Sequence, residues 1–165
     1  MPRTSSDIVS TVEISGFLVS DRADEVLVTY SLGSCIGVTI YDPELKIGGL
    51  IHCLLPLSKD HPEKAAERPA TYVDTGIVVL LNELFARGAV RERLIVKVAG
   101  GANTMDANNR FKIGKRNVTV LKKILWKNEL MIAEEDTGGS EPRTMRFYLE
   151  SGRTTLSFRG EEKEL

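Results

Sequence analysis

Short apolar runs dominate the first part of the chain, and glycine or charged residues separate them. Several runs alternate between apolar and polar positions and are rich in β-branched residues, which is typical of strands. This pattern predicts strands over Val12–Val19, Glu25–Ser31, Ile36–Tyr41 and Ile47–Leu55. The next segment is predicted to be a loop because it contains Pro56, Ser58, Asp60 and Pro62.

Two longer segments carry apolar residues at helical spacing. The first predicts a helix over Thr71–Arg87, and Gly88 suits the position just after a helix. The second predicts a helix over Gly114–Lys127, which Asn128 is expected to close in a left-handed conformation. Its inward residues are expected to be Val120, Leu121, Ile124 and Leu125.

One strand-like run lies between the two predicted helices, and three more follow the second helix. They predict strands over Arg93–Ala99, Met131–Glu135, Thr144–Leu149 and Thr154–Phe158. The glycine- and asparagine-rich segment Gly100–Arg110 is expected to be a loop. Residues 1–10 and the tail Gly160–Leu165 are polar and are expected to be flexible. Strands first, then two helices separated by strands, indicate a layered α+β domain.

Composition narrows the class of protein. The chain has 165 residues, of which 42% are hydrophobic and 27% charged, so we expect a single folded domain over residues 1–165. A formal net charge of −1 does not provide the excess of positive charge that is typical of nucleic-acid-binding proteins. No apolar run is long enough for membrane insertion, and the first residues lack the apolar core of a signal peptide. A cytoplasmic location is therefore expected.

Residues able to perform chemistry are few. The chain has two cysteines, Cys35 and Cys53, and two histidines, His52 and His61. Two cysteines are too few for a disulfide framework and are expected to be thiols in a reducing compartment. A zinc site made of all four side chains is disfavoured because the sequence has no Cys-x-x-Cys pair. We therefore predict neither a metal nor a cofactor.

The dipeptide Asp42-Pro43 predicts a turn, because proline fixes φ and aspartate can hydrogen bond to its own backbone. If the loop consists of the four residues Pro43–Lys46, the flanking runs form a hairpin in which Gly37 lies opposite His52. A loop one residue longer or shorter, or a bulge, would exchange the two faces of the hairpin.

In this register Cys35 and His52 share one face as diagonal neighbours, about 7–8 Å apart at the backbone. Cys53 points to the opposite face, because side chains alternate along a strand. The hairpin therefore predicts that Cys35, rather than Cys53, is the partner of His52.

A thiol and an imidazole on one face suit nucleophilic catalysis. The imidazole of His52 can accept the proton of the Cys35 thiol or, once charged, stabilise the thiolate. Gly33 lets a substrate carbonyl approach the backbone amides of Ser34 and Cys35, which can hold an oxyanion. The imidazole also needs a group that orients it, and Thr29 or Ser31 on the preceding strand can supply a hydroxyl.

Each of these residues also has a purely structural interpretation. Cys35 and His52 can be buried core residues, since cysteine is among the most buried residue types. Thr29 is β-branched and ordinary in a strand. The basic residues around the second predicted helix are most simply a solvated face; they are Lys112, Lys115, Arg116, Lys122, Lys123 and Lys127.

Longer motifs give the chain a resemblance to a known family. The stretches TYSLGSCIGV and YDPELKIGGLIHCLLP resemble the chemoreceptor glutamine deamidase family, CheD. The resemblance continues through YVDTGIVVLLNEL, GGAN, IGKRNV and EDTGG, in the order of the family and over nearly the whole chain. The Thr-x5-Cys-x16-His spacing is its most specific part.

The resemblance implies that Cys35 is the catalytic cysteine, His52 the catalytic histidine and Thr29 the catalytic threonine. It implies hydrolysis of chemoreceptor glutamine side chains to glutamate with release of ammonia, through a thioester. The implied fold is one of packed β-sheets with helices outside, as in bacterial toxin deamidases. The implied partners are the Glu/Gln-rich methylation helices of the receptor cytoplasmic domain and a CheC-type phosphatase that competes with the receptor.

The chain departs from the common family pattern at Cys53, at Thr104–Asp106 and at Pro142, which affects partner preference rather than chemistry. Two alternatives to deamidation stay open: an adaptor that binds a CheC-type phosphatase with little turnover, and a receptor glutamyl methylesterase. The basic second helix can also steer encounter with acidic receptor helices.

Overall fold

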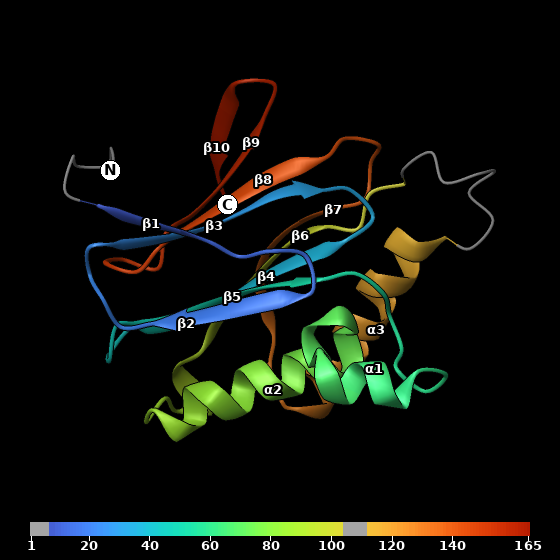
Figure 1. Ribbon diagram of the computed structural model, residues 1–165. Coiled ribbons are helices and arrows are strands. Elements are labelled where there is room, and N and C mark those ends of the chain that lie inside the picture. Colours follow the sequence, from blue (N-terminus) through green and yellow to red (C-terminus); the bar gives the residue numbers. More distant parts are fainter. Residues whose placement is uncertain (1–6, 104–111) are drawn as a thin grey trace.

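The computed structural model describes residues 7–103 and 112–165. Two five-stranded sheets are stacked face to face, and three helices cover the outer face of one of them (Figure 1). The result is a three-layer arrangement of sheet, sheet and helices. The predicted class, α+β with packed sheets and helices on the outside, is confirmed.

The first sheet has the strand order β1-β3-β8-β9-β10 and is exposed on its outer side (Figure 1). β1 runs parallel to β3, whereas the other neighbours are antiparallel, so the sheet is mixed. Its strands are β1 (Ile8–Thr11), β3 (Glu25–Leu32), β8 (Arg143–Tyr148), β9 (Thr154–Phe158) and β10 (Glu161–Glu164).

The second sheet is the middle layer and has the order β2-β5-β4-β6-β7. It is also mixed, because β6 and β7 are parallel and the remaining pairs antiparallel. Its strands are β2 (Gly16–Ser20), β5 (Ile47–Cys53), β4 (Ile36–Asp42), β6 (Ile95–Gly100) and β7 (Ile132–Thr137).

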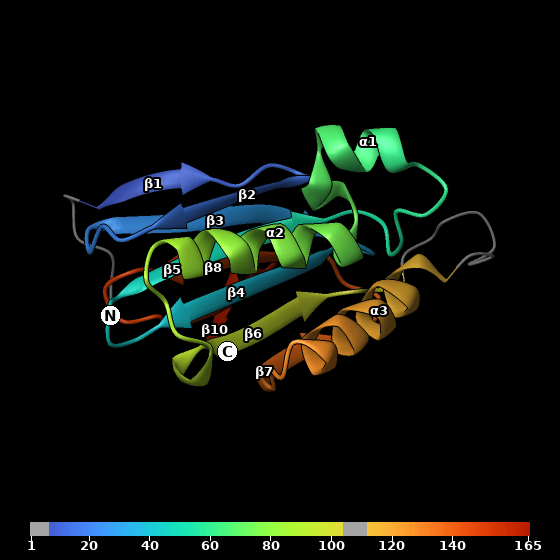
Figure 2. The same ribbon diagram turned by 90° about the horizontal axis from the view of Figure 1, so that it is seen from below.

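The helices lie against the outer face of this second sheet, α2 and α3 along it and α1 near one end (Figure 2). α2 (Val73–Ala86) and α3 (Ile113–Lys127) match the two predicted helices, and Gly88, which suits the position just after a helix, follows α2 with φ +98°. The short helix α1 (Pro62–Glu67) and the 3-10 turns Pro69–Thr71 and Arg91–Arg93 are not predicted by the pattern.

Alternation along β4 and β5 divides the interior into two layers. One side of these strands packs on the helices through aliphatic residues such as Ile51, Leu80 and Leu121. The other side packs between the sheets, where Leu50 and Phe147 are fully buried. We call these the helix layer and the inter-sheet layer. Every residue of β4 and β5 is buried, as expected for central strands covered on both faces.

The predicted hairpin register is confirmed. Asp42 pairs with Ile47 and Gly37 with His52, so the connecting loop is Pro43–Lys46. The Asp42 carboxylate accepts hydrogen bonds from the backbone amides of Glu44 (3.1 Å) and Leu45 (3.3 Å), as the turn chemistry predicts.

Both ends of the described chain differ from prediction. Ile8–Thr11 forms β1, and Glu161–Glu164 forms β10, where flexible segments are expected. The predicted single strand Val12–Val19 is wrong, because the chain leaves β1 after Thr11, turns through Ser15 at φ +63°, and begins β2 at Gly16. Pairing stabilises these short strands: β1 pairs with β3 in parallel, and β10 pairs with β9 as the second strand of a hairpin.

Two further expectations concern loops. The predicted left-handed cap of α3 is wrong at Asn128, whose φ is −96°, and the left-handed residue is Glu129 with φ +59°. Of the loop Gly100–Arg110, only Gly100–Asn103 belongs to the described residues; Gly100 ends β6, and Gly101–Asn103 have no regular structure. The departure at Thr104–Asp106 lies outside the described residues.

Candidate active site

Residues Gly33–Cys35 form the corner between β3 and β4. We call it the nucleophile corner, because it contains the predicted nucleophile. Hydrogen bonds to its backbone carbonyls hold it in place. A bulge in β3 between Thr29 and Leu32 precedes it, and Ser31 adopts φ +58°. The carbonyl of Gly33 accepts from the Ala102 amide, and that of Cys35 from the Gly101 amide, both at 2.8 Å.

A side chain holds the carbonyl between these two. The Ser34 carbonyl accepts a hydrogen bond of 2.9 Å from Nδ2 of Asn117, which lies on α3. A trans peptide places its N–H opposite its C=O, so fixing the carbonyls of Gly33 and Ser34 turns the amides of Ser34 and Cys35 the other way. Neither amide donates a hydrogen bond to another described residue. Among the described residues, both amides therefore lack another residue as acceptor, which fits the predicted oxyanion role.

Close backbone packing makes this corner possible. A Cβ on Gly100, which has φ +105°, would come within 2.3 Å of the Cys35 carbonyl oxygen. A Cβ on Gly114 at the start of α3 would come within 2.3 Å of the Ala102 carbonyl oxygen. Glycine at these positions lets β6 approach Cys35 and lets α3 approach the Gly101–Ala102 segment that holds the corner.

The imidazole of His52 is oriented by Thr29. Nδ1 of His52 lies 2.7 Å from Oγ1 of Thr29, and that hydroxyl also lies 2.7 Å from the carbonyl oxygen of Val12. The carbonyl can only accept, so the single hydroxyl proton of Thr29 is donated to Val12. Nδ1 must then be the donor to Thr29, which leaves Nε2 unprotonated. Nε2 is buried and has no hydrogen-bond partner within the described residues.

Burial favours the neutral forms of His52 and Cys35. It lowers the pKa of His52 from 6.5 to about 4, because an imidazolium is poorly solvated in the inter-sheet layer. Burial also raises the pKa of the Cys35 thiol above its ordinary value, and the backbone N–H of the same residue offsets only part of the shift. Of the two predicted roles of the imidazole, these pKa directions favour that of proton acceptor from a neutral thiol over a preformed thiolate–imidazolium pair.

The structure separates the predicted residues from their alternatives. Cys35 belongs to the inter-sheet layer and Cys53 to the helix layer, so the predicted difference in face is confirmed. Thr29, and not Ser31, contacts the imidazole. The ring of His61 stacks on Tyr72 with centroids 6.2 Å apart, away from this constellation.

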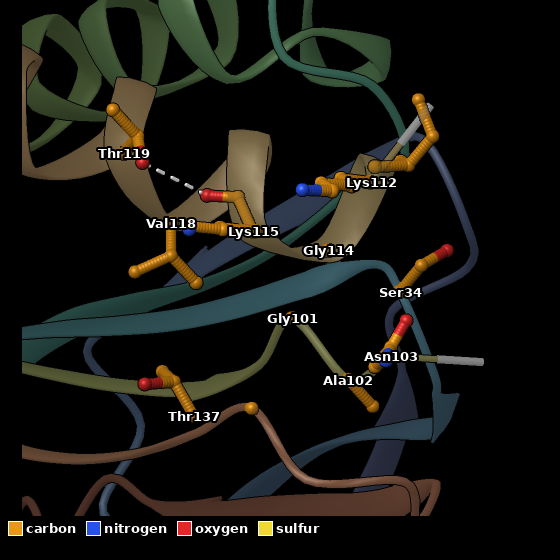
Figure 3. Close-up of a pocket in the computed structure, with 12 residues that line it drawn as sticks. Ser34, Gly101, Ala102, Asn103, Lys112, Gly114, Lys115, Val118, Thr119 and Thr137 are labelled. Atoms are coloured by element: carbon orange, nitrogen blue, oxygen red, sulfur yellow. Dashed lines mark hydrogen bonds between the residues drawn. The ribbon is translucent and has the colours of Figure 1, made fainter. Parts of the chain in front are cut away.

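A cavity of about 530 Å³ opens beside the nucleophile corner (Figure 3). Ser34 stands at its edge, between the Gly101–Asn103 segment and the first turns of α3. Its size is that of ordinary ligand pockets. Its walls are formed in part by Lys112, Val118, Thr137 and Gly138.

Sequence reasoning missed the support around the nucleophile. Asn117 is fully buried and occupies the same stripe of α3 as Leu121 and Leu125. A polar residue on an apolar helical stripe is the signal that identifies such a position. The carbonyl of Val12, which fixes the tautomer of His52, leaves no signal in the sequence because any residue could provide it.

Two further findings concern cofactors and membranes. No three histidine, cysteine, aspartate or glutamate side chains of residues 7–103 and 112–165 are grouped so that they could hold a metal ion. Within the same residues, no helix combines the length and apolar character needed to cross a membrane.

Comparison with known proteins agrees with the sequence resemblance. Residues 54–158 match the family model of CheD, described as CheD chemotactic sensory transduction. A relative from Solibacter usitatus, named probable chemoreceptor glutamine deamidase CheD, is 46% identical over 154 residues, covering 93% of this chain and 91% of the relative. One from Syntrophus aciditrophicus, named probable chemoreceptor glutamine deamidase CheD 1, is 44% identical over 149 residues, covering 90% and 93%.

Proposed function

This chain belongs to the CheD family, and we propose that it is a chemoreceptor glutamine deamidase in which Cys35 is the nucleophile, His52 the general base and acid, and Thr29 the group that orients His52. The observation that carries the proposal is the pair of hydrogen bonds at Thr29. They leave Nε2 of His52 unprotonated in the layer that also contains Cys35.

The first step forms a tetrahedral intermediate. Sγ of Cys35 attacks the side-chain carboxamide carbon of a receptor glutamine while its proton passes to Nε2 of His52. The carbonyl π bond breaks, and its electron pair becomes an oxyanion. The backbone amides of Ser34 and Cys35, which Gly33 leaves accessible, donate to that oxygen. Because thiol and imidazole start neutral, the proton moves when the substrate arrives rather than beforehand.

The second step releases ammonia and then glutamate. The imidazolium returns its proton to the departing nitrogen as the carbon–nitrogen bond breaks, which leaves a thioester on Cys35. Nε2 then takes a proton from water as the water oxygen attacks the thioester carbon. The carbon–sulfur bond breaks, and the thiol regains a proton. The net reaction converts glutamine and water into glutamate and ammonia.

The cavity beside Ser34 supports access of a protein substrate. It adjoins the nucleophile corner and is large enough to accept residues next to the target glutamine, which would come from the methylation helices of the receptor. A CheC-type phosphatase is proposed as a second partner that occupies the same region in competition with the receptor. This part of the proposal is supported by the family resemblance alone.

Mass spectrometry of a receptor cytoplasmic fragment tests the proposal. Incubation with the protein should raise the mass of specific glutamines by about 1 Da and release ammonia in equal amount. Cys35→Ala should lower the rate at least about 1,000-fold, because the nucleophile is lost. Cys53→Ala is the matched control and should stay within about threefold of the wild type, since Cys53 faces the helices.

The products separate deamidation from the alternatives. Methanol released from methylated receptor without any glutamine conversion would indicate a methylesterase. Tight binding of a CheC-type phosphatase with no ammonia release from any receptor would indicate an adaptor. An unchanged rate in Cys35→Ala would contradict the assigned nucleophile.

A further inference from the structure

The side chain of Asn117 connects the two strands that carry the reactive groups. Its Nδ2 donates to the carbonyl of Ser34 at 2.9 Å and to the carbonyl of Leu54 at 3.2 Å. Ser34 immediately precedes Cys35, and Leu54 comes two residues after His52. We propose that Asn117 is a positioning residue for catalysis, which sets the separation of the nucleophile corner from the strand of His52. This inference rests on the proposed function.

The position of Asn117 relative to the hairpin explains why a side chain is needed there. The ladder between β4 and β5 ends at the pair Ile36–Cys53. Beyond that pair the two chains separate, β4 toward the nucleophile corner and β5 toward α1. Asn117 donates to each chain just beyond the ladder, to Leu54 one position after Cys53 and to Ser34 two positions before Ile36. A single planar amide therefore replaces the backbone hydrogen bonds that would otherwise fix their spacing.

The other contacts of the corner do not have this property. The Gly101 and Ala102 amides hold the carbonyls of Cys35 and Gly33, but both belong to one segment and neither reaches β5. They fix the corner against β6. Among the hydrogen bonds of the described residues, only those of Asn117 connect the corner with the chain that follows His52.

The chemistry of the residue fits a positioning role better than a role in helix stability. Asparagine is a weak helix former, and Asn117 lies mid-helix on an apolar stripe. Its Oδ1 is buried with no hydrogen-bond partner among the described residues. An unpaired buried oxygen is unfavourable. The residue therefore keeps both donors directed at the two chains although a leucine would suit the helix better.

Two variants test the proposal with purified protein and a receptor fragment. Asn117→Ala removes both donors, and Asn117→Asp keeps the shape but offers no N–H. Both should lower kcat about 10- to 100-fold while KM changes less than about threefold, since the cavity beside Ser34 is untouched. In Asn117→Asp the ratio of its kcat to that of wild type should rise as pH falls, because a protonated carboxyl regains one donor.

Asn128→Ala provides a matched control. The amide of Asn128 also donates to a backbone carbonyl, that of Ile124 at 2.8 Å, but at the opposite end of α3 from the nucleophile corner. This variant should lose thermal stability to a degree similar to Asn117→Ala and keep wild-type kcat. Loss of kcat in Asn117→Ala beyond that of Asn128→Ala at equal melting temperature is the expected result.

Three outcomes would overturn the inference. Folded Asn117 variants with kcat within threefold of wild type would show that the spacing is set elsewhere. Equal loss of kcat in Asn117→Ala and Asn128→Ala would show that the contacts of Asn117 contribute to folding stability only. Failure of both Asn117 variants to fold would show the same. A wild-type protein that converts no glutamine would contradict the proposed function itself, and the inference, which rests on that function, would fail as a consequence.

Discussion

The inter-sheet layer and the helix layer share the strands β4 and β5 but differ in polarity. The helix layer is mostly aliphatic and contains Cys53, and its buried Asn117 donates to backbone carbonyls rather than to another side chain. The inter-sheet layer carries polar bonds between the sheets: Thr29 with His52, and Thr39 with Thr154 at 3.1 Å. The comparison shows that one layer provides apolar packing while the other also holds a buried polar network.

The two cysteines show what this difference does to a single residue type. Cys53 is fully buried among aliphatic side chains, and burial strongly raises the pKa of its thiol. Cys35 is 7% exposed and lies at the end of the inter-sheet layer. Its own backbone carbonyl accepts a hydrogen bond from the Gly101 amide. The surroundings of each thiol therefore depend on the face on which the residue lies, and the faces alternate along a strand.

Alkylation should reveal the largest difference between the layers. Cys53 can react only when its core opens, so iodoacetamide should modify Cys35 about 1,000-fold faster. The rate at Cys35 should still rise through pH 9, because burial raises the pKa of its thiol. Peptide mapping by mass spectrometry measures both sites in one sample. Equal rates at the two cysteines, or a plateau at Cys35 below pH 7, would contradict the assigned environments.

Acid should destabilise the inter-sheet layer through His52. The unfolded chain binds a proton at this residue near pH 6.5 and the folded chain only near pH 4, so between these values the unfolded state holds more protons. Stability contributed by neutral His52 is complete above pH 6.5 and is lost as pH falls to 4. The loss amounts to about 3 kcal/mol, which urea unfolding at several pH values measures.

His52→Asn gives the control for this measurement. Its amide nitrogen can replace Nδ1 as the donor to Thr29, and it does not titrate. The variant should lose about 3 kcal/mol less than the wild type between pH 6.5 and 4, while the carboxylates contribute equally to both proteins. Parallel pH curves for the two proteins would argue against the lowered pKa of His52.

Removing the polar link between the sheets at Thr29 should have the smallest of these effects. Thr29→Val keeps the shape but leaves Nδ1 of His52 without an acceptor and the Val12 carbonyl without a donor. We expect kcat/KM to fall about 30-fold, equivalent to about 2 kcal/mol. Thr29→Ser retains the hydroxyl and should stay within about fivefold of the wild type. If Thr29→Val and Thr29→Ser are equally active, Thr29 does not orient the imidazole.

Much of the site could be predicted from the sequence because its geometry begins with a local turn. Asp42-Pro43 fixes a loop of known length, and the loop fixes the register through Gly37 and His52. Strand alternation then assigns Cys35 and Cys53 to opposite faces without any knowledge of what covers them. The helices α2 and α3 follow in the same way from apolar spacing.

Contacts between distant segments could not be predicted this way. The short strand β1 exists because β3, which begins 14 residues after β1 ends, offers an open edge. The choice of Thr29 over Ser31 depends on the bulge in β3, and the tautomer of His52 depends on a carbonyl at Val12. Local sequence thus determined which residues share a face. Only the tertiary structure decided which polar atoms meet, because hydrogen-bond partners across layers are set by packing between segments far apart in the chain.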